Sequence, residues 1–134
     1  MPELKLINSR FIKINGERNL DFSGEISAKT NIKILDLNSI NNSKNSIQIK
    51  YFFEIDYEKL GKIQLEGIIY VLIDVKTYKE LLKSWESKKI ETPDFVNITN
   101  LIIQKASLKS FELEEELGLP IHIRLPKVDL KPNN

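Results

Sequence analysis

The fold is decided by the stretch Ser46–Val75, which reads SIQIKYFFEIDYEKLGKIQLEGIIYVLIDV. In its first half every second residue is apolar or aromatic, and polar residues fill most of the gaps: Ile47, Ile49, Tyr51, Phe53, Ile55 and Tyr57. A two-residue period is typical of a β-strand that buries one face and leaves the other in water. A polar break over residues 56–62 follows, and its Gly61 can take the positive φ of a tight hairpin. The stretch therefore predicts two antiparallel strands joined by a turn.

The second strand of this hairpin is apolar on both faces. The alternation resumes at Ile63 and continues to Val75, while the intervening positions Ile68, Tyr70 and Leu72 are apolar as well. Strands with this pattern are usually covered on both sides. We therefore expect the second face to be covered by a helix of the same chain or by a partner chain.

Two more strands precede the hairpin. Alternation from Leu4 to Ile14 predicts the first, with a bulge near Asn8-Ser9 and a turn at Asn15-Gly16. Alternation from Ile26 to Leu37 predicts the second, and its phase shifts at Leu35.

Two helices follow the hairpin. Thr77-Tyr78-Lys79-Glu80 matches a capping box, so a short helix is expected to begin there, with Thr77 as its N-cap. Thr92-Pro93 predicts the start of a long helix over residues 93–117, which Gly118 ends as the C-cap. The apolar stripe of the long helix consists of Phe95, Ile98, Ile102, Ala106, Leu113 and Leu117.

The last segment, Leu119 to Leu130, alternates apolar residues between Pro120 and Pro126, which favours an extended conformation at the surface or at a sheet edge. Four strands followed by two helices indicate the α+β class. We therefore predict one domain over residues 1–134, with a four-stranded antiparallel sheet packed by a short and a long helix and followed by an extended proline-bounded segment.

The composition argues against several function classes. The net charge is +1 and lysines outnumber arginines 17 to 3, which disfavours nucleic acid as a partner. The absence of cysteine excludes disulfides, thiolate metal sites and cysteine nucleophiles. No apolar run is long enough to insert into a membrane and residues 1–15 carry no signal-peptide pattern, so we expect a cytoplasmic protein.

No constellation of residues indicates catalysis. His122 is the single histidine and sits in an apolar alternation, which favours a surface or partly paired role. The acidic run Glu112, Glu114, Glu115 and Glu116 is expected to form a solvated helix face, and the five glycines never cluster into a phosphate-binding loop. We therefore predict that the protein is not an enzyme and has no metal or cofactor.

What remains unexplained is a surplus of apolar residues in the strand around 68–72, the long helix and the C-terminal segment. Two accounts stay open: self-assembly consumes this surface, or part of it binds other polypeptides. A third hypothesis, a small-molecule enzyme or ligand binder, would require a closed pocket with converging carboxylates.

Several local strings resemble the SecB-like export chaperones. Ile7-x-x-Arg10-x-Ile12-x-Ile14 is similar to the opening strand of that family, and Ile32-Lys33-Ile34 before Asp36-Leu37 to its second strand. Ile63-Gln64 followed by Gly67-Ile68-Ile69 is similar to the fourth strand. After the long helix, Leu119-Pro120, Ile121, Ile123, Leu125-Pro126 and Val128-Asp129-Leu130 resemble the family's proline-bounded segment.

The resemblance implies an ATP-independent holdase that binds unfolded or preprotein chains in apolar grooves, linked to protein export. It implies a homotetramer built as a dimer of dimers, in which helices such as 93–117 pair. The implied client-binding residues are Ile32, Ile34 and Leu37 with Leu119, Ile121, Ile123 and Leu125. With the surplus described above, the predicted oligomer interface consists of Ile98, Leu101, Ile102 and Leu108 on the helix and Ile68, Tyr70 and Leu72 on the strand.

Three departures from the family pattern narrow this expectation. Family members are acidic, whereas this chain has a net charge of +1. The short helix that follows the proline segment in the family is missing, as is the acidic surface that contacts the SecA motor, since the sequence ends Lys131-Pro132-Asn133-Asn134. The resemblance therefore supports client holding rather than delivery to SecA. The alternative is a structural or adaptor oligomer with no client binding.

Overall fold

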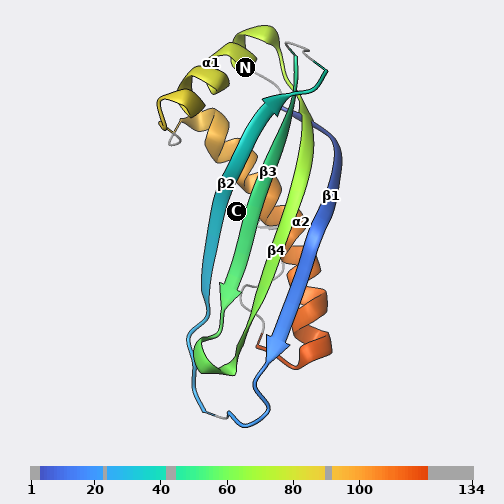
Figure 1. The fold of residues 1–134 in the computed structure, drawn as a ribbon, viewed down its shortest axis with the longest axis vertical. Coiled ribbons are helices and arrows are strands. Elements are labelled where there is room, and N and C mark those ends of the chain that lie inside the picture. Colours follow the sequence, from blue (N-terminus) through green and yellow to red (C-terminus); the bar gives the residue numbers. More distant parts are fainter. Residues whose placement is uncertain (1–3, 23, 42–44, 90–91, 121–134) are drawn as a thin grey trace, which may run out of the picture.

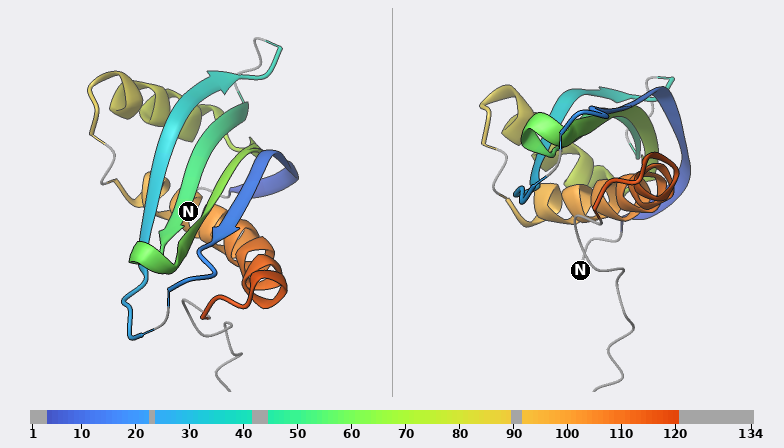
Figure 2. Two further views of the ribbon diagram at one scale, coloured as in Figure 1. Left: turned by 60° about the horizontal axis from the view of Figure 1, so that its bottom comes forward. Right: turned by 90° about the horizontal axis from the view of Figure 1, so that it is seen from below.

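A computed structural model describes residues 4–22, 24–41, 45–89 and 92–120. Four antiparallel strands form one sheet in the order β1-β4-β3-β2, and two helices lie against one face of it (Figures 1 and 2). We call the face toward the helices the inner face and the opposite one the outer face. The predicted α+β class, with its four-stranded antiparallel sheet and its short and long helices, is confirmed.

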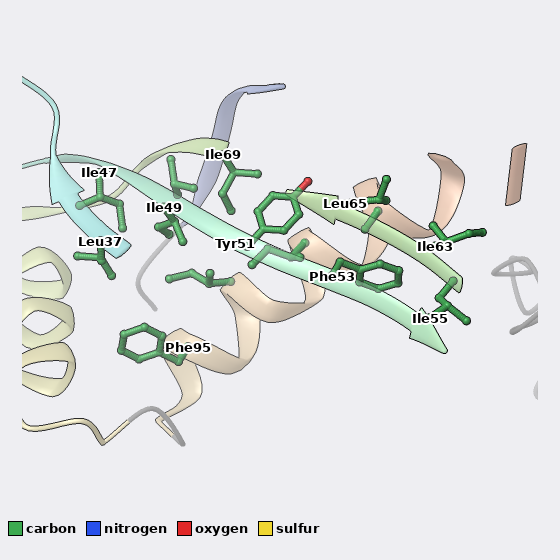
Figure 3. Packing of buried hydrophobic residues seen from close by; sticks show 14 of the residues in the cluster. Leu37, Ile47, Ile49, Tyr51, Phe53, Ile55, Ile63, Leu65, Ile69 and Phe95 are labelled. Atoms are coloured by element: carbon green, nitrogen blue, oxygen red, sulfur yellow. The ribbon is translucent and has the colours of Figure 1, made fainter. Parts of the chain in front are cut away.

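The predicted hairpin is the centre of the sheet. Strand β3 (Ser46–Asp56) and strand β4 (Gly61–Leu72) are joined by a short 3-10 turn, η1 (Glu58–Leu60). Alternate residues of both strands are buried on the inner face, as the two-residue period predicts (Figure 3). They form directly opposed pairs: Ile47–Val71, Ile49–Ile69, Tyr51–Gly67, Phe53–Leu65 and Ile55–Ile63.

The hairpin connection needs Gly61 because another strand end approaches it closely. A Cβ at Gly61 would run into the backbone carbonyl of Glu17 and would lie 3.1 Å from Cα of Arg18. Gly61 has the predicted positive φ, at 158°, and Glu58 is a second residue of the connection with positive φ, at 60°.

The edge strands, β1 (Lys5–Arg18) and β2 (Lys29–Ser39), pair with β4 and β3 respectively. Their registers shift at three places, and the residue left out of the pairing is apolar and exposed each time: Ile7, Ile12 and Leu35. The predicted bulge in the first strand and the phase shift at Leu35 correspond to two of these.

The turn predicted at Asn15-Gly16 is wrong, because β1 continues through both residues to Arg18. Gly16 is there to make room for a helix: a Cβ at this position would lie 2.7 Å from Cδ1 of Leu117. The glycine therefore marks a close contact between strand and helix rather than a change of chain direction.

Helix α1 (Val75–Glu86) begins earlier than predicted. Its N-cap is Asp74, whose carboxylate accepts a hydrogen bond of 2.7 Å from the backbone N–H of Thr77. Thr77 is therefore buried within the first turn instead of capping it. The hydrogen bond from Thr77 also lowers the pKa of Asp74 from its usual value.

Helix α2 (Pro93–Leu117) has the predicted bounds. The hydroxyl of Thr92 accepts a hydrogen bond from the N–H of Phe95, and Gly118 ends the helix with φ of 69°. The first part of the predicted stripe, from Phe95 to Ala106, is fully buried. Beyond it the buried positions are polar, at Ser107, Ser110 and Glu114, whereas the predicted Leu113 and Leu117 are only half-buried.

The helices of this chain do not cover the second face of β4, because both lie on the inner face (Figures 1 and 2), so cover of the outer face by a partner chain stays a prediction. On the outer face Ile68 and Tyr70 are half-buried and Leu72 is exposed, and the described part of the chain places no helix there. Long neighbouring side chains do part of the shielding, since the Arg10 guanidinium lies 5.9 Å from the centre of the Tyr70 ring.

No helix within the described ranges has the length and apolarity needed to cross a membrane.

Candidate polypeptide-binding surface

The predicted client-binding residues on β2 divide into two kinds. Ile32, Ile34 and Leu37 all point to the inner face, opposite Phe53, Tyr51 and Ile49. Leu37 is 3% exposed and belongs to the core, whereas Ile32 and Ile34 are half-buried at its margin. Only the latter two are accessible to another polypeptide.

The path of α2 leaves the inner-face residues Ile32 and Ile34 of β2 at the margin of the core. The helix crosses the sheet obliquely (Figure 1) and makes its main strand contacts with β1 and β4. Leu35, which the bulge turns out of the regular pairing, is 42% exposed and adds a third apolar side chain to the edge strand. We refer to Ile32, Ile34 and Leu35 as the β2 strip.

Within the described ranges, the backbone of β2 pairs with another strand on one side only. β2 is the last strand in the sheet order, and among the described residues β3 is its only neighbouring strand. Its outer-face residues are polar: Lys29, Asn31, Lys33, Asp36 and Asn38. Charged residues on an edge strand oppose uncontrolled pairing with other chains. The β2 strip is therefore an apolar margin beside free backbone groups on an otherwise polar strand.

The C-terminal part of the predicted client site is only partly described. Leu119 is buried in the core, and its N–H donates a hydrogen bond of 2.8 Å to the carbonyl oxygen of Glu114. Ile121, Ile123 and Leu125 lie outside the described residues, as do His122 and the proline-bounded extended segment.

The predicted helical interface residues do not share one surface. Ile98 and Ile102 face the sheet and are completely enclosed by this chain, so neither is accessible to a partner. Leu101 is half-buried, and Leu108 is 60% exposed. Among these four residues, only Leu108 lies fully on the surface.

A second set of exposed apolar residues follows the opposite edge of the sheet. Ile7, Ile12 and Ile14 on β1 are each about half exposed, and two of them are bulge residues. β1 is the other terminal strand in the sheet order, so β4 is its only neighbouring strand in the described part of the chain.

Sequence reasoning missed a buried polar pair. The hydroxyl of Tyr57 donates a hydrogen bond to Oε2 of Glu114, and both side chains are completely buried. Burial raises the pKa of Tyr57 above its usual range, and the hydrogen bond to Glu114 raises it further. The missed signal was helical spacing, since Ala106, Ser110 and Glu114 are four residues apart and continue the stripe.

A row of polar side chains crosses the outer face. Nδ2 of Asn15 donates to Oε1 of Gln64 (3.4 Å), Nε2 of Gln64 donates to Oε2 of Glu54 (2.8 Å), and Nδ2 of Asn31 donates to Oε1 of Glu54 (3.4 Å). The row joins all four strands through their side chains, which is typical of a solvated face that satisfies its own polar groups.

The end of the sheet near η1 has a polar depression. Acidic, basic and amide side chains line it: Glu17, Arg18, Asn19, Asp56, Glu58, Lys59, Gly61 and Lys62. Asn19 ties this end of β1 to η1, with its backbone N–H donating to the carbonyl of Leu60 (2.7 Å) and its side-chain amide donating to the carbonyl of Lys59 (3.2 Å). Three acidic and three basic residues line the depression, so it carries no net charge that would favour a charged ligand.

No group of three or more acidic or histidine side chains within the described ranges is placed to hold a metal ion. Comparisons with protein-family models, with curated proteins and with solved structures gave no match to this chain. The accessible apolar side chains of the two edge strands are therefore the candidate binding surface.

Proposed function

We propose that this protein is an ATP-independent holdase of the cytoplasm, which binds unfolded polypeptide segments along β2 and works as a homo-oligomer. The observation that carries the proposal is the β2 strip, a set of accessible apolar side chains beside the free backbone edge of a terminal strand. Unfolded chains, including preproteins held before export, are the clients of this class that the resemblance to SecB-like chaperones implies.

A terminal strand with this arrangement suits clients of varied sequence. An extended segment that adds to a sheet edge is held mainly by hydrogen bonds between backbone groups, which every sequence offers. Apolar side chains of the client gain further free energy by covering Ile32, Ile34 and Leu35, at about 25 cal/mol per Å² of apolar area removed from water. Binding of this kind needs no nucleotide, because release follows from client folding by mass action.

The test is suppression of the aggregation of a chemically denatured client without ATP. The wild-type protein should suppress light scattering at about one subunit per client chain, since one β2 edge binds one segment. An absence of suppression at a tenfold excess of the protein would rule out the proposal.

A matched pair of variants assigns the activity to the β2 strip. The double variant Ile32→Ser/Ile34→Ser removes two inner-face side chains and should lose most of the suppression. The control Asn31→Ser/Lys33→Ser changes two outer-face residues of the same strand and should retain it. Circular dichroism checks that both variants keep the wild-type fold. Equal suppression of aggregation by the two variants would show that the client does not bind to the β2 strip.

The alternative, an adaptor whose apolar surface is consumed by self-assembly, makes a different prediction. A dye that fluoresces on exposed apolar surface should bind the native holdase and be displaced by the client. A native oligomer that binds neither the dye nor the client would favour the adaptor.

A further inference from the structure

The outer face of the sheet is basic over most of its length. We call the part between the row of Leu72 and the row of Glu66 the basic patch, because the strand registers place more basic than acidic residues there. Two acidic residues, Asp36 and Glu66, lie in it. The basic residues of the patch are five: Lys5, Arg10, Lys13, Lys33 and Lys50.

The two rows nearest η1 have the opposite balance. Two lysines, Lys29 and Lys62, share them with three carboxylates, those of Glu17, Glu54 and Asp56. The positive charge of the outer face is therefore concentrated at the end toward α1, although the whole chain has a net charge of only +1.

The basic side chains of the patch are not neutralised by this chain within the described ranges. The one ion pair in that part of the chain joins Lys109 and Glu112 on α2. Asp36 lies opposite Lys50 in the strand register, but its carboxylate accepts hydrogen bonds of 2.9 Å from the N–H of Leu37 and from the side-chain amide of Asn38. The cations of the patch are therefore available to a ligand.

These cations flank apolar surface on the two central strands. Phe52 on β3 and Tyr70 on β4 are half-buried, and Leu72 at the end of β4 is 39% exposed. The guanidinium of Arg10 lies 5.9 Å from the centre of the Tyr70 ring, so one cation already packs on this apolar surface. An apolar centre with a charged rim is typical of a surface that binds another protein.

We propose that the basic patch docks an acidic segment of a different protein. Carboxylates of that segment lie over the lysines of the patch, and its apolar side chains cover Tyr70 and Leu72. Complementary charge of this kind speeds association and selects the partner. The site goes beyond the proposed client binding, because Ile32 and Ile34 lie on the inner face of the sheet. One chain therefore holds a client and the acidic partner on opposite faces.

Charge disfavours two occupants that this chain itself offers. Residues 121–134 contain three basic residues and one acidic residue, so they carry the same sign as the patch. A twofold contact of the patch with itself brings the same surface from both copies together, which places lysines against lysines. Neither the C-terminal segment nor a symmetric dimer therefore matches the patch.

The identity of the basic residues favours carboxylates over a phosphate backbone. Four of the five are lysines, which are point charges without the planar fork that binds phosphate through two hydrogen bonds. The fifth, Arg10, lies against the Tyr70 ring. The carboxylates of Asp36 and Glu66 also repel a polyanion as densely charged as a nucleic acid.

The experiment measures binding of a fluorescein-labelled peptide by fluorescence anisotropy. The probe is a peptide of about ten residues with interspersed glutamates, leucines and serines, which spans the patch when extended at ~3.3 Å per residue. Wild-type protein should bind it, and added salt should weaken the binding. Arg10→Glu/Lys50→Glu should bind it at least about tenfold more weakly, because two attractions become repulsions.

The matched control is Lys29→Glu/Lys62→Glu, which changes the net charge equally on the same face but outside the patch. Its affinity should stay within about twofold of wild type, because salt screens charges this far from the peptide. A second pair tests the apolar contact. Leu72→Ser should weaken binding about fivefold, whereas Leu108→Ser, at an exposed leucine of α2, should not. Circular dichroism checks that every variant keeps the wild-type fold.

Four results would overturn the proposal. Wild-type protein that does not bind the peptide, or equal losses in the two charge-reversal variants, would show that the patch is not a specific site. Loss of peptide binding in Ile32→Ser/Ile34→Ser would show that the peptide binds as a client. Tighter binding of an oligothymidylate of equal charge would assign the patch to nucleic acid. Self-association that Arg10→Glu/Lys50→Glu abolishes, measured by sedimentation, would assign it to the acidic run of α2 in a second copy.

The same samples separate this inference from the holdase. Arg10→Glu/Lys50→Glu should suppress client aggregation as well as wild type does, because it leaves the β2 strip unchanged. Protein that binds the acidic peptide without suppressing aggregation rejects the holdase alone. Protein that suppresses aggregation without binding the peptide rejects the acidic partner alone.

Discussion

Tyr57 and Glu114 form a buried hydrogen bond between the residue that follows β3 and the last turn but one of α2, 57 positions apart in the sequence. Both side chains are fully enclosed. The pair fixes the C-terminal half of α2 against the hairpin, where the stripe of the helix is polar rather than apolar.

We expect Tyr57→Phe to lower the free energy of unfolding by about 2 kcal/mol, because a buried carboxyl group loses a donor that water cannot replace. Urea denaturation followed by tryptophan fluorescence measures the change. A matched control is Tyr78→Phe, which alters a half-buried tyrosine on α1. A loss below about 0.5 kcal/mol would show that the carboxyl group does not depend on this hydroxyl.

The buried tyrosines predict a loss of stability at alkaline pH. Burial raises the pKa of Tyr51 to about 12 and raises that of Tyr57 further, from an ordinary value of 10.0. Above pH 10 the unfolded chain therefore releases protons that the folded chain retains, so the contribution of these two tyrosines to stability is constant below this pH and falls as pH rises.

Thermal unfolding at successive pH values would measure this slope, and the tyrosinate absorbance of Tyr51 and Tyr57 should appear together with unfolding. Tyr51→Phe should reduce the slope. Tyrosinate from all four tyrosines in a still-folded protein would contradict the assignment.

Ser110 lies in the buried stripe of α2, and its Oγ has no hydrogen-bond partner among the described residues. Ser110→Ala should raise the free energy of unfolding by about 1 kcal/mol, because it removes an uncompensated polar group and improves helix propensity. Gln104→Ala, at an exposed position of the same helix, isolates the propensity contribution of about 0.4 kcal/mol. If Ser110→Ala instead lowers the free energy of unfolding, the Ser110 hydroxyl forms a hydrogen bond in solution.

Gly67 and Gly16 both leave space for a neighbouring group, which is rigid at Gly67 and a flexible side chain at Gly16. A Cβ at Gly67 would overlap the Tyr51 ring and lie 2.9 Å from the carbonyl oxygen of Arg10, whereas at Gly16 it would meet the end of the Leu117 side chain. Gly67→Ala should therefore cost about 2 kcal/mol of stability and Gly16→Ala clearly less. Equal losses, measured by thermal and urea unfolding, would contradict this reading of the packing.

Local signals in the sequence were sufficient for the framework of the fold. The alternation in β3 and β4 and the Thr92-Pro93 and Gly118 signals of α2 depend on the nearest few residues, and the structure agrees with them. Asp74 and Thr77 are both good N-cap residues, so propensity alone did not distinguish them. The N-cap is Asp74 because β4 ends at Leu72 and α1 already begins at Val75, three residues later.

The errors arise where distant residues meet. From the sequence alone Gly16 is typical of a turn, but in the fold it makes room for the side chain of Leu117. Glu114 is typical of a solvated helix face, but in the fold it is buried and accepts a hydrogen bond from Tyr57. At the candidate site, the apolar pattern predicted the strand β2 and the resemblance to SecB-like chaperones implied its client-binding residues, yet neither separates the enclosed Leu37 from the accessible Ile34. Likewise, Ile102 could equally face its own sheet or a second subunit until the path of α2 is known.

The strand order β1-β4-β3-β2 determines the sequence in which the strands can pair during translation on the ribosome. β2, β3 and β4 are consecutive neighbours and pair as each one emerges, whereas β1 is made first and has no partner until β4 is complete. At ~5–20 residues per second, the roughly 50 residues between them take about 3–10 s to translate. The first strand to be synthesised is therefore the last strand to pair. During this time its isoleucine side chains are exposed to any factor that contacts nascent chains.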